Sequence, residues 1–308
     1  GTLAGAVLGA LFRRGSRGGR LLACWLEGFQ PGAVAMAGLC ALGMWVLSQL
    51  SPFVPVIESD VLRDNLKPAW QVLHGEYAWR PFHFACYFFY LAGALLLVRR
   101  LRKHGRDRKT VTVGFFLIAA GVLLIKPFIY KHQLSLEAIA ALVAFAVAVC
   151  LISIWFTRIR SAAEQSPVCI LLLLQAGFIA YELEPAAGSY TPFNWVPFAM
   201  QNEVPLTSLN NILATTWPFM AAGSVVALAA FQSDDRDRRR QMALFGGIAV
   251  LLIVWVLEGT QCYIRGRYGD FTTVLLAVAA WSVPWLLVGE SEPELQHELP
   301  ILPGTLHR

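Results

Sequence analysis

The sequence predicts an all-α protein, a polytopic transmembrane helical bundle of about eight complete spans in two four-helix units plus a truncated N-terminal helix. Of the 308 residues, 56% are apolar and only 15% are charged, and the mean hydropathy is +0.55. Long stretches almost free of charge recur along the chain, close to the length that a helix needs to cross a bilayer. This composition excludes a soluble enzyme, and the period-two alternation of a membrane β-barrel is absent.

The hydropathy pattern places the spans and the segments between them. Complete spans are predicted near residues 33–50, 82–99, 110–126, 134–156, 168–182, 208–231, 241–258 and 271–288. The apolar run 1–12 is too short to cross a bilayer, and we interpret it as the end of a truncated upstream helix. Residues 13–32 form a basic cytoplasmic and interfacial segment, in which 21–30 is expected to be amphipathic. Residues 289–308 are expected to be a flexible cytoplasmic tail.

Basic residues predict the orientation in the membrane. Most Lys and Arg residues fall in alternate connections, at 13–20, 99–109, 157–166 and 232–240. By the positive-inside rule these connections and the C-terminus are expected to be cytoplasmic. The loops 51–81, 126–134, 182–207 and 259–270 are then outside. The net charge of +5 arises from these clusters, so it indicates topology rather than nucleic-acid binding.

The eight spans follow one plan twice, in residues 33–156 and 168–288. Each unit has a first helix, a long outer loop with a Pro-Phe pair, a second helix, a basic inner loop and two closing helices. The third helix of each unit ends at a charged or acidic residue, Lys126 or Glu258, and an acid starts the fourth, Glu137 or Asp270. Units with an even number of spans repeat in the same orientation.

No motif for a metal, haem or organic cofactor is present, and none is expected. The six cysteines are scattered singly, with no Cys-x-x-Cys or His-x-x-x-His pair, so a metal site and a disulfide framework have no support. Walker, Rossmann and Gly-x-Ser-x-Gly motifs are also absent from the sequence.

Polar residues concentrate between the last two spans. Glu258 and Gln261 share a helix face, and the helix dipole disfavours an anion at the C-terminal position of Glu258. We expect Arg265 or Arg267 to return across the turn and pair with Glu258, either as a structural ion pair or as part of a binding site. Asp270 stands where it would cap the last helix, and capping alone would explain it.

A second outer feature precedes the sixth span. Phe193, Trp195 and Phe198 suit an aromatic belt at the interface, while Asn194 either binds a headgroup or satisfies loop backbone. Asn210 and Asn211 leave a similar choice, with N-capping of the next helix favoured.

Taken together, these motifs resemble the VanZ-like membrane proteins in order and spacing over residues 168–288. The resemblance rests on Asn194-Trp-Val-Pro-Phe198, then Asn211 with Trp217-Pro-Phe219 and Gly223, then Glu258-x-x-Gln261 and Arg267-x-x-Asp270. The chain departs from the family where Thr273 replaces a second acid and Ala277 replaces an asparagine, and the unit at 33–156 lacks these signatures. The earlier unit would then be a degenerate scaffold.

The resemblance implies a cell-envelope protein, since the family takes its name from low-level teicoplanin resistance. Beyond the lipid bilayer, the expected partners are lipid-linked cell-wall or exopolysaccharide intermediates or lipoglycopeptides. The residues expected to bind the headgroup of such an amphiphile are Asn194, Asn211, Glu258, Gln261, Arg267 and Asp270. The competing hypothesis is an intramembrane transferase or hydrolase acting on a lipid-linked glycan, with Glu258 or Asp270 as general acid or base. A transporter ranks third, because the span interiors carry almost no charge.

Overall fold

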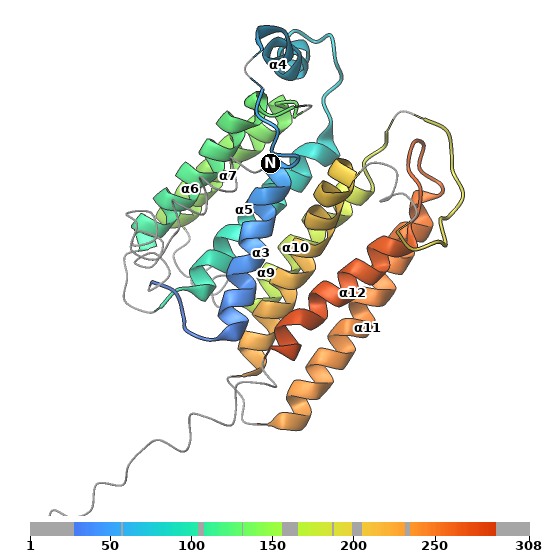
Figure 1. Cartoon of the computed structure of the whole chain (residues 1–308). Coiled ribbons are helices and arrows are strands. Elements are labelled where there is room, and N and C mark those ends of the chain that lie inside the picture. The colour runs from blue at the N-terminus through green and yellow to red at the C-terminus, as the bar shows by residue number, and fades with distance from the viewer. Residues whose placement is uncertain are drawn as a thin grey trace, which may run out of the picture.

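A computed structural model describes residues 28–287 apart from 57, 104–107, 131, 156–165, 187, 199–204 and 232–234. Within this part the chain is all-α, with nine α-helices, one short 3₁₀ turn and no sheet (Figure 1). The elements are α3 Ala33–Leu50, α4 Ser59–Leu73, α5 Pro81–Leu101, α6 Arg108–Ile125, η1 Lys126–Phe128, α7 Leu136–Trp155, α9 Pro167–Glu182, α10 Pro205–Ala230, α11 Arg236–Gln261 and α12 Phe271–Leu286. The residues predicted to end a truncated helix, 1–12, most of the segment 13–32 and the residues 289–308 lie outside the described residues.

Each of the eight predicted spans coincides with a helix. Six are long and apolar enough to cross a membrane, namely α3, α5, α10 and α11 together with stretches over α6 and α7. Helix length and hydropathy therefore identify the chain as a polytopic membrane protein. The helices α9 and α12 are apolar but have 16 residues each, so their complete crossing stays a prediction. The orientation in the membrane also stays a prediction.

Helix α4 lies within the segment that the sequence analysis left as an outer loop. Its charged residues and Pro68 keep its hydropathy low, which concealed it. One of its faces is nevertheless packed, with Asn65 buried and donating through Nδ2 to the carbonyls of Pro127 and Ile129 at 2.9 and 3.0 Å. The helix consequently lies across the ends of α6 and α7 (Figure 1).

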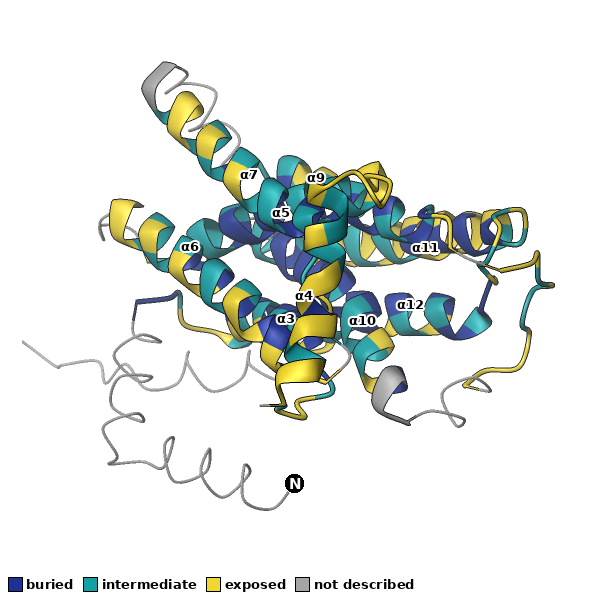
Figure 2. Cartoon of the chain, turned by 90° about the horizontal axis from the view of Figure 1, so that it is seen from above, coloured by how far each residue is buried: buried dark blue, intermediate teal, exposed yellow. Residues whose placement is uncertain are grey.

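The two predicted four-helix units share one core. Helix α10 packs mainly on α3 and α12, and α5 packs mainly on α9 and α7. The first helix of each unit thus packs on the second helix of the other. Trp217 of α10 is buried against the rings of Tyr90 and Trp45, at centroid distances of 4.6 and 6.1 Å. The buried residues gather in these central helices, whereas α6, α7 and α11 have smaller buried shares (Figure 2). The domain boundaries proposed from sequence stay a prediction.

Close helix packing depends on small residues in α10. A Cβ added at Gly223 would lie 2.7 Å from the backbone oxygen of Trp281 in α12. Glycine therefore lets the two helices approach closely, as small residues commonly do between membrane helices.

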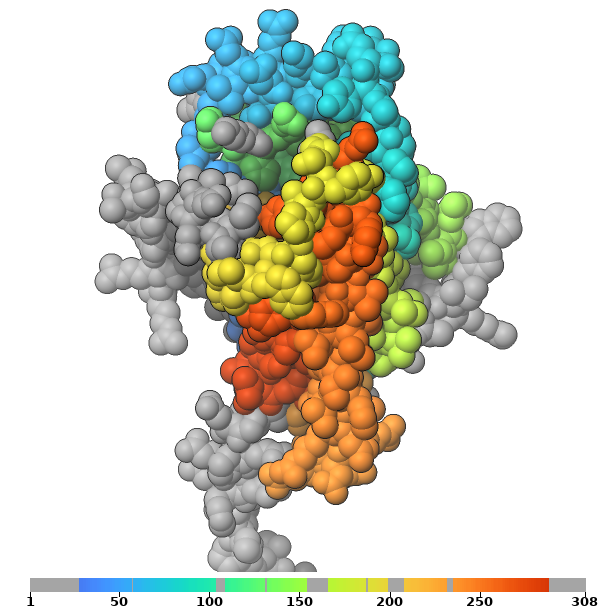
Figure 3. All heavy atoms as spheres, turned by 90° about the vertical axis from the view of Figure 1, so that its right-hand side faces the viewer, coloured from blue at the N-terminus to red at the C-terminus, as the bar shows by residue number. Residues whose placement is uncertain are grey.

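The loops predicted to lie on one side of the membrane meet at one end of the bundle. In the first half, Pro55 and Ile129 form a backbone bridge between the loop after α3 and the connection from α6 to α7. In the second half, Asn194 and Asp270 form a bridge between the loop after α9 and the connection from α11 to α12, but this bridge is parallel whereas that of Pro55 and Ile129 is antiparallel. In Figure 3 the yellow segment after α9 covers the orange turn between α11 and α12. This pairing positions the polar groups described next.

Candidate functional site: a cavity beside Glu258

A cavity of about 100 Å³ lies where α9 and α11 end and α10 and α12 begin. This volume corresponds to about three water molecules. We call it the Glu258 cavity, and its walls are formed by Tyr181, Glu182, Asn211, Thr215, Glu258, Gln261, Arg267, Tyr268, Asp270, Thr273 and Leu276. Ten of these eleven side chains carry a polar group, so the cavity is built for hydrogen bonding.

Glu258 has the smallest exposed fraction of the three acids of the cavity. Its side chain lies in the last turn of α11 and only 1% of the residue is exposed. One carboxylate oxygen, Oε2, accepts the backbone N–H of Asp270 at 2.6 Å. The other, Oε1, is buried and meets no donor among the described residues in hydrogen-bond geometry, although the Thr273 side chain in the same wall interacts with this carboxyl group. A buried polar atom without a partner is costly, so this oxygen marks a position where a donor would bind favourably.

Asp270 is occupied by the start of α12. It is the N-cap residue, and its Oδ1 accepts from the backbone N and Oγ1 of Thr272 at 2.9 and 2.8 Å. The predicted capping role is therefore confirmed. Asn194 adds a longer contact from Nδ2 to the same oxygen at 3.4 Å.

Glu182 is a cavity residue that sequence reasoning did not select. It ends α9, is buried, and its Oε2 accepts from Gln261 Nε2 at 2.5 Å. The two residues are 79 positions apart in the chain. The available signal was an acid directly after an apolar run, which could also be read as an ordinary exposed loop residue.

The predicted ion pair between Glu258 and an arginine is wrong. Arg267 Nε donates to the Glu184 carbonyl at 2.7 Å, and Nη2 donates to the Tyr181 carbonyl at 2.6 Å. The last carbonyls of a helix have no partner within the helix and carry the negative end of its dipole. Arg267 therefore stabilises the end of α9, which presents several such acceptors. The other candidate, Arg265, is exposed, and its carbonyl accepts from Ala186 N.

The two asparagines of the predicted site have different placements. Asn194 is held mainly by its backbone, whose N–H donates to Gly269 O at 2.8 Å and whose carbonyl accepts from Phe271 N at 3.0 Å. Asn211 lines the cavity, but its predicted N-capping role is wrong because α10 already begins at Pro205. Proline is favoured in the first turn of a helix, so the helix starts a turn earlier than the asparagines. Five of the six predicted site residues thus line the cavity, and Asn194 contacts one of them.

An aromatic group flanks this turn on the outside. Phe193 packs on Trp195 and Trp255 with ring centroids 4.6 and 5.8 Å apart, and Trp255 packs on Phe271 at 5.9 Å. Trp195 is 64% exposed although it belongs to this group. Exposed aromatic rings at the end of an apolar helix are typical of a membrane interface.

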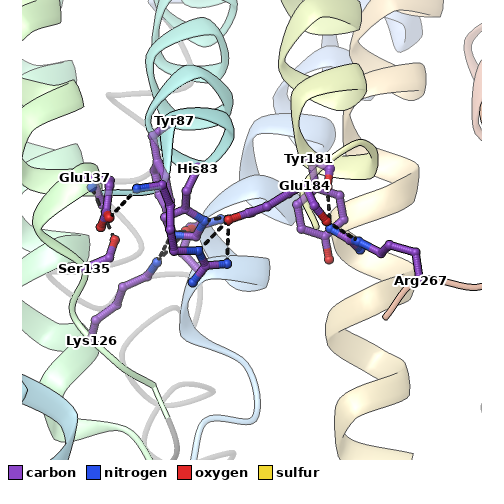
Figure 4. A network of polar contacts seen from close by, with 11 residues as sticks. His83, Tyr87, Lys126, Ser135, Glu137, Tyr181, Glu184 and Arg267 are labelled. Carbon is purple, nitrogen blue, oxygen red and sulfur yellow. Dashed lines mark hydrogen bonds and ion pairs between the residues drawn. The ribbon is translucent and has the colours of Figure 1, made fainter. Parts of the chain in front are cut away.

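A second polar group, the Lys126 cluster, lies at the same end of the bundle in the first half. Lys126 is buried, and its Nζ donates to Gln49 Oε1 at 2.7 Å and to the Tyr87 hydroxyl at 2.5 Å (Figure 4). The hydroxyl of Tyr87 in turn donates to Gln49 at 3.1 Å. The sequence analysis noted Lys126 only as the end of a span, because its partners come from two other helices.

Glu184 lies between the two polar groups, because it binds Arg267 of the cavity and His83, whose ring packs on that of Tyr87 with centroids 5.1 Å apart. Its carboxylate binds Arg80 Nη2 at 2.5 Å and His83 Nδ1 at 3.2 Å, while its carbonyl binds Arg267 (Figure 4). Burial raises the pKa of Glu184, but the hydrogen bonds and charges of His83 and Arg80 outweigh burial, so the pKa lies below its ordinary value. The backbone N–H of Arg80 also donates to the buried Glu137 at 3.1 Å.

Among the described residues, no three His, Cys, Asp or Glu side chains gather in a way that could hold a metal ion. Comparison with protein-family models, with curated proteins and with solved structures finds no significant match to this chain. The resemblance to the VanZ-like proteins therefore stays a prediction.

Proposed function

We propose that this polytopic membrane protein is a VanZ-like envelope protein that binds the polar headgroup of an amphiphile in the Glu258 cavity. The observation that carries the proposal is the buried, unpartnered Oε1 of Glu258 in the cavity wall. A headgroup that donates a hydrogen bond would satisfy this oxygen, and the free energy gained would contribute directly to binding.

The surroundings of the cavity suit an amphiphile better than a soluble molecule. Trp255 and Trp195 lie beside the turn that closes the cavity, with their ring centroids 5.7 Å apart. Trp255 lies one helical turn before Glu258, and 38% of it is exposed. A ligand with its polar end in the cavity and its apolar chain along these rings would keep both parts in favourable environments. Lipid-linked cell-wall or exopolysaccharide intermediates and lipoglycopeptides have this construction.

The proposal includes an orientation in which the cavity faces outward from a bacterial plasma membrane and the C-terminus is cytoplasmic. Labelling with a membrane-impermeant maleimide in intact cells tests it. Tyr263, which is 83% exposed in the turn after α11, is replaced by Cys in a variant whose six native cysteines are changed to Ala. Labelling without permeabilisation supports the orientation, and labelling only after permeabilisation contradicts it.

Envelope function is tested by teicoplanin susceptibility of a sensitive host that expresses the chain. The parent is compared with Glu258→Gln and with Glu58→Gln, an exposed acid at the start of α4 that is remote from the cavity. All three proteins are matched for abundance in the membrane. Resistance that is lost only in Glu258→Gln supports the proposal, whereas equal susceptibility of parent and Glu258→Gln contradicts it.

An intramembrane hydrolase or transferase is the second candidate. It is favoured by the position of Glu258 beside Glu182 in one cavity, since a carboxyl group with a free oxygen can transfer a proton to a substrate. Asp270 is the weaker candidate for acid or base, because three donors already occupy its Oδ1. Incubating the purified parent with lipid-linked glycans tests this function. Turnover by the parent that is lost in Glu258→Gln would support the enzyme hypothesis over binding without catalysis. Absence of turnover with every lipid-linked glycan tested would contradict the enzyme hypothesis.

A further inference from the structure

We infer that the group recognised by the Glu258 cavity is a cationic amine, carried at the end of an amphiphile headgroup. This inference rests on the proposed function and names the chemical class of its ligand. It depends on four features of the cavity: its excess of carboxyl groups, the unpartnered oxygen, its size, and its aromatic walls.

The cavity has three carboxyl groups and one cation, Arg267, whose charge acts on Glu182 but forms no ion pair with any of the three. Glu182, Glu258 and Asp270 are each at most 6% exposed, and among the described residues none of the three forms an ion pair. Arg267 is the one basic residue in the wall, and two of its N–H groups are occupied by backbone carbonyls at the end of α9. A buried carboxylate gains most from a partner of opposite charge, so a cationic ligand fits where a phosphate would be repelled.

The unpartnered oxygen is an independent sign of a missing donor. Glu258 Oε1 lies in the wall of the cavity, although the other carboxylate oxygen is satisfied by Asp270 N. An ammonium group carries three donors and no acceptor, so it can satisfy this oxygen and reach a second acceptor of the wall at the same time.

The size of the cavity limits the ligand. A volume of about 100 Å³ accommodates a group of a few heavy atoms, such as an aminoethyl end, but is too small to enclose a complete sugar ring. The group that enters is therefore a small terminal substituent, and the rest of the headgroup stays outside.

Two tyrosine rings complete the wall. Tyr181 and Tyr268 line the cavity, and the guanidinium of Arg267 already lies 5.4 Å from the centroid of the Tyr181 ring. Aromatic faces attract ammonium groups in partly desolvated sites. The wall is thus suited to a cation on more than one side.

The first half of the bundle contains an ammonium group at the corresponding place in helix order. Lys126 lies at the end of α6, the third helix of the first half, and the Glu258 cavity lies at the end of α11, the third helix of the second half. The Nζ atom of Lys126 donates to Gln49 and Tyr87, and it lies 4.8 Å from the centroid of the Tyr87 ring. An amide oxygen, a phenol and an aromatic face hold that amine. The second half offers Glu258 and Gln261 at the end of α11, with tyrosines and further carboxylates from the end of α9 and the connection before α12, but supplies no lysine. An external amine would therefore take the equivalent role.

The test measures binding of dodecylammonium by the complete chain in nanodiscs of zwitterionic lipid at pH 7. Binding is followed by tryptophan fluorescence, because Trp195 and Trp255 lie beside the cavity. Dodecyl phosphate, dodecyl maltoside and the short amine ethylammonium serve as comparison probes. The parent is measured beside Glu258→Gln and Glu182→Gln, with Glu58→Gln as the control that retains binding.

We expect dodecylammonium to bind the parent and the control alike, and each cavity variant about tenfold or more weakly. The two cavity variants provide independent tests, and a thermal unfolding scan selects those that fold. Binding of dodecyl maltoside or dodecyl phosphate without binding of dodecylammonium would overturn the amine inference while leaving the proposed function intact. Ethylammonium binding as tightly as dodecylammonium would support the amine site but contradict recognition of an amphiphile. Absence of binding by every probe would overturn both.

Discussion

The Lys126 cluster and the Glu258 cavity occupy the same end of one bundle, but their polar groups are satisfied in different ways. Lys126 is bound by Gln49 and Tyr87, so the buried amine has partners from two other helices. Glu258 is equally buried, yet one of its carboxylate oxygens has no partner in the described part of the chain. A closed network contributes to stability, whereas an incomplete one remains available for a ligand.

This difference arises although the helices of the two halves follow the same order. In both halves the loop after the first helix forms a backbone bridge with the connection between the third and fourth helices. The same pair of connections therefore meets in each half, although the bridge is antiparallel in the first half and parallel in the second. The side chains at the two places decide whether the polar groups are satisfied. The comparison teaches that a site is recognised by unsatisfied groups rather than by the number of polar residues.

The largest effect is expected for Gly269→Ala, between the cavity residues Tyr268 and Asp270. The added Cβ would meet the Glu258 carbonyl oxygen and would lie 2.6 Å from Phe193 Cδ2, so the turn must shift. We expect a loss of about 3 kcal/mol in the free energy of unfolding, together with loss of ligand binding. Unfolding by SDS in mixed micelles measures the first quantity.

Gly259→Ala is the matched control for Gly269→Ala. No atom lies within 4 Å of its added Cβ, and the residue is helical. Replacing a helical glycine by alanine should stabilise the protein by about 0.5–1 kcal/mol. Equal destabilisation by both changes would show that the close contact at Gly269 is not the cause.

Lys126→Met should have the next largest effect, confined to stability. The change leaves the acceptors of Gln49 and Tyr87 without the ammonium donor, which should cost about 2 kcal/mol. The exposed Lys67→Met is its control, with an expected change below about 0.5 kcal/mol. If Lys126→Met were as stable as the parent, the hydrogen bonds of the Lys126 cluster would not contribute to stability, and the contrast with the Glu258 cavity would be wrong.

Asp270→Ala should cost about 1 kcal/mol, because it removes the N-cap of α12. Asn194→Ala should cost less, since Asn194 contributes mainly its backbone to the bridge, and its side chain adds only a 3.4 Å contact to Asp270 and an exposed hydrogen bond from Val196 N at 3.2 Å. Chemical unfolding of the two variants in parallel measures the difference. A larger loss of stability in Asn194→Ala than in Asp270→Ala would show that the Asn194 side chain, rather than the N-cap, stabilises this turn.

The smallest effect on stability is expected from the protonation of Glu184, which lies between the Lys126 cluster and the Glu258 cavity. Because the pKa of Glu184 in the folded protein lies below its ordinary value, its contribution is complete above about pH 4.3, the usual value for glutamate. It is lost as the pH falls below that value and through the pKa of the folded state. The Glu184→Gln variant should therefore show a shallower loss of stability between about pH 4.5 and 3 than the parent. Identical slopes would exclude this contribution.

The sequence by itself determined the eight apolar helices, because a segment free of charge for some twenty residues has few alternatives to a buried or membrane-spanning helix. It also identified the capping role of Asp270, which depends on the neighbouring Thr272 alone. Both signals are local in the chain.

Only the tertiary structure decided which polar groups meet. Arg267 binds the carbonyls that end α9 instead of Glu258, Glu182 reaches Gln261 across 79 positions, and the partners of Lys126 come from α3 and α5. The position of α4 is likewise decided by a tertiary contact, because Asn65 donates to the carbonyls of Pro127 and Ile129. Hydropathy depends on composition along the chain, whereas a buried hydrogen bond depends on which helix ends the packing of the core brings together.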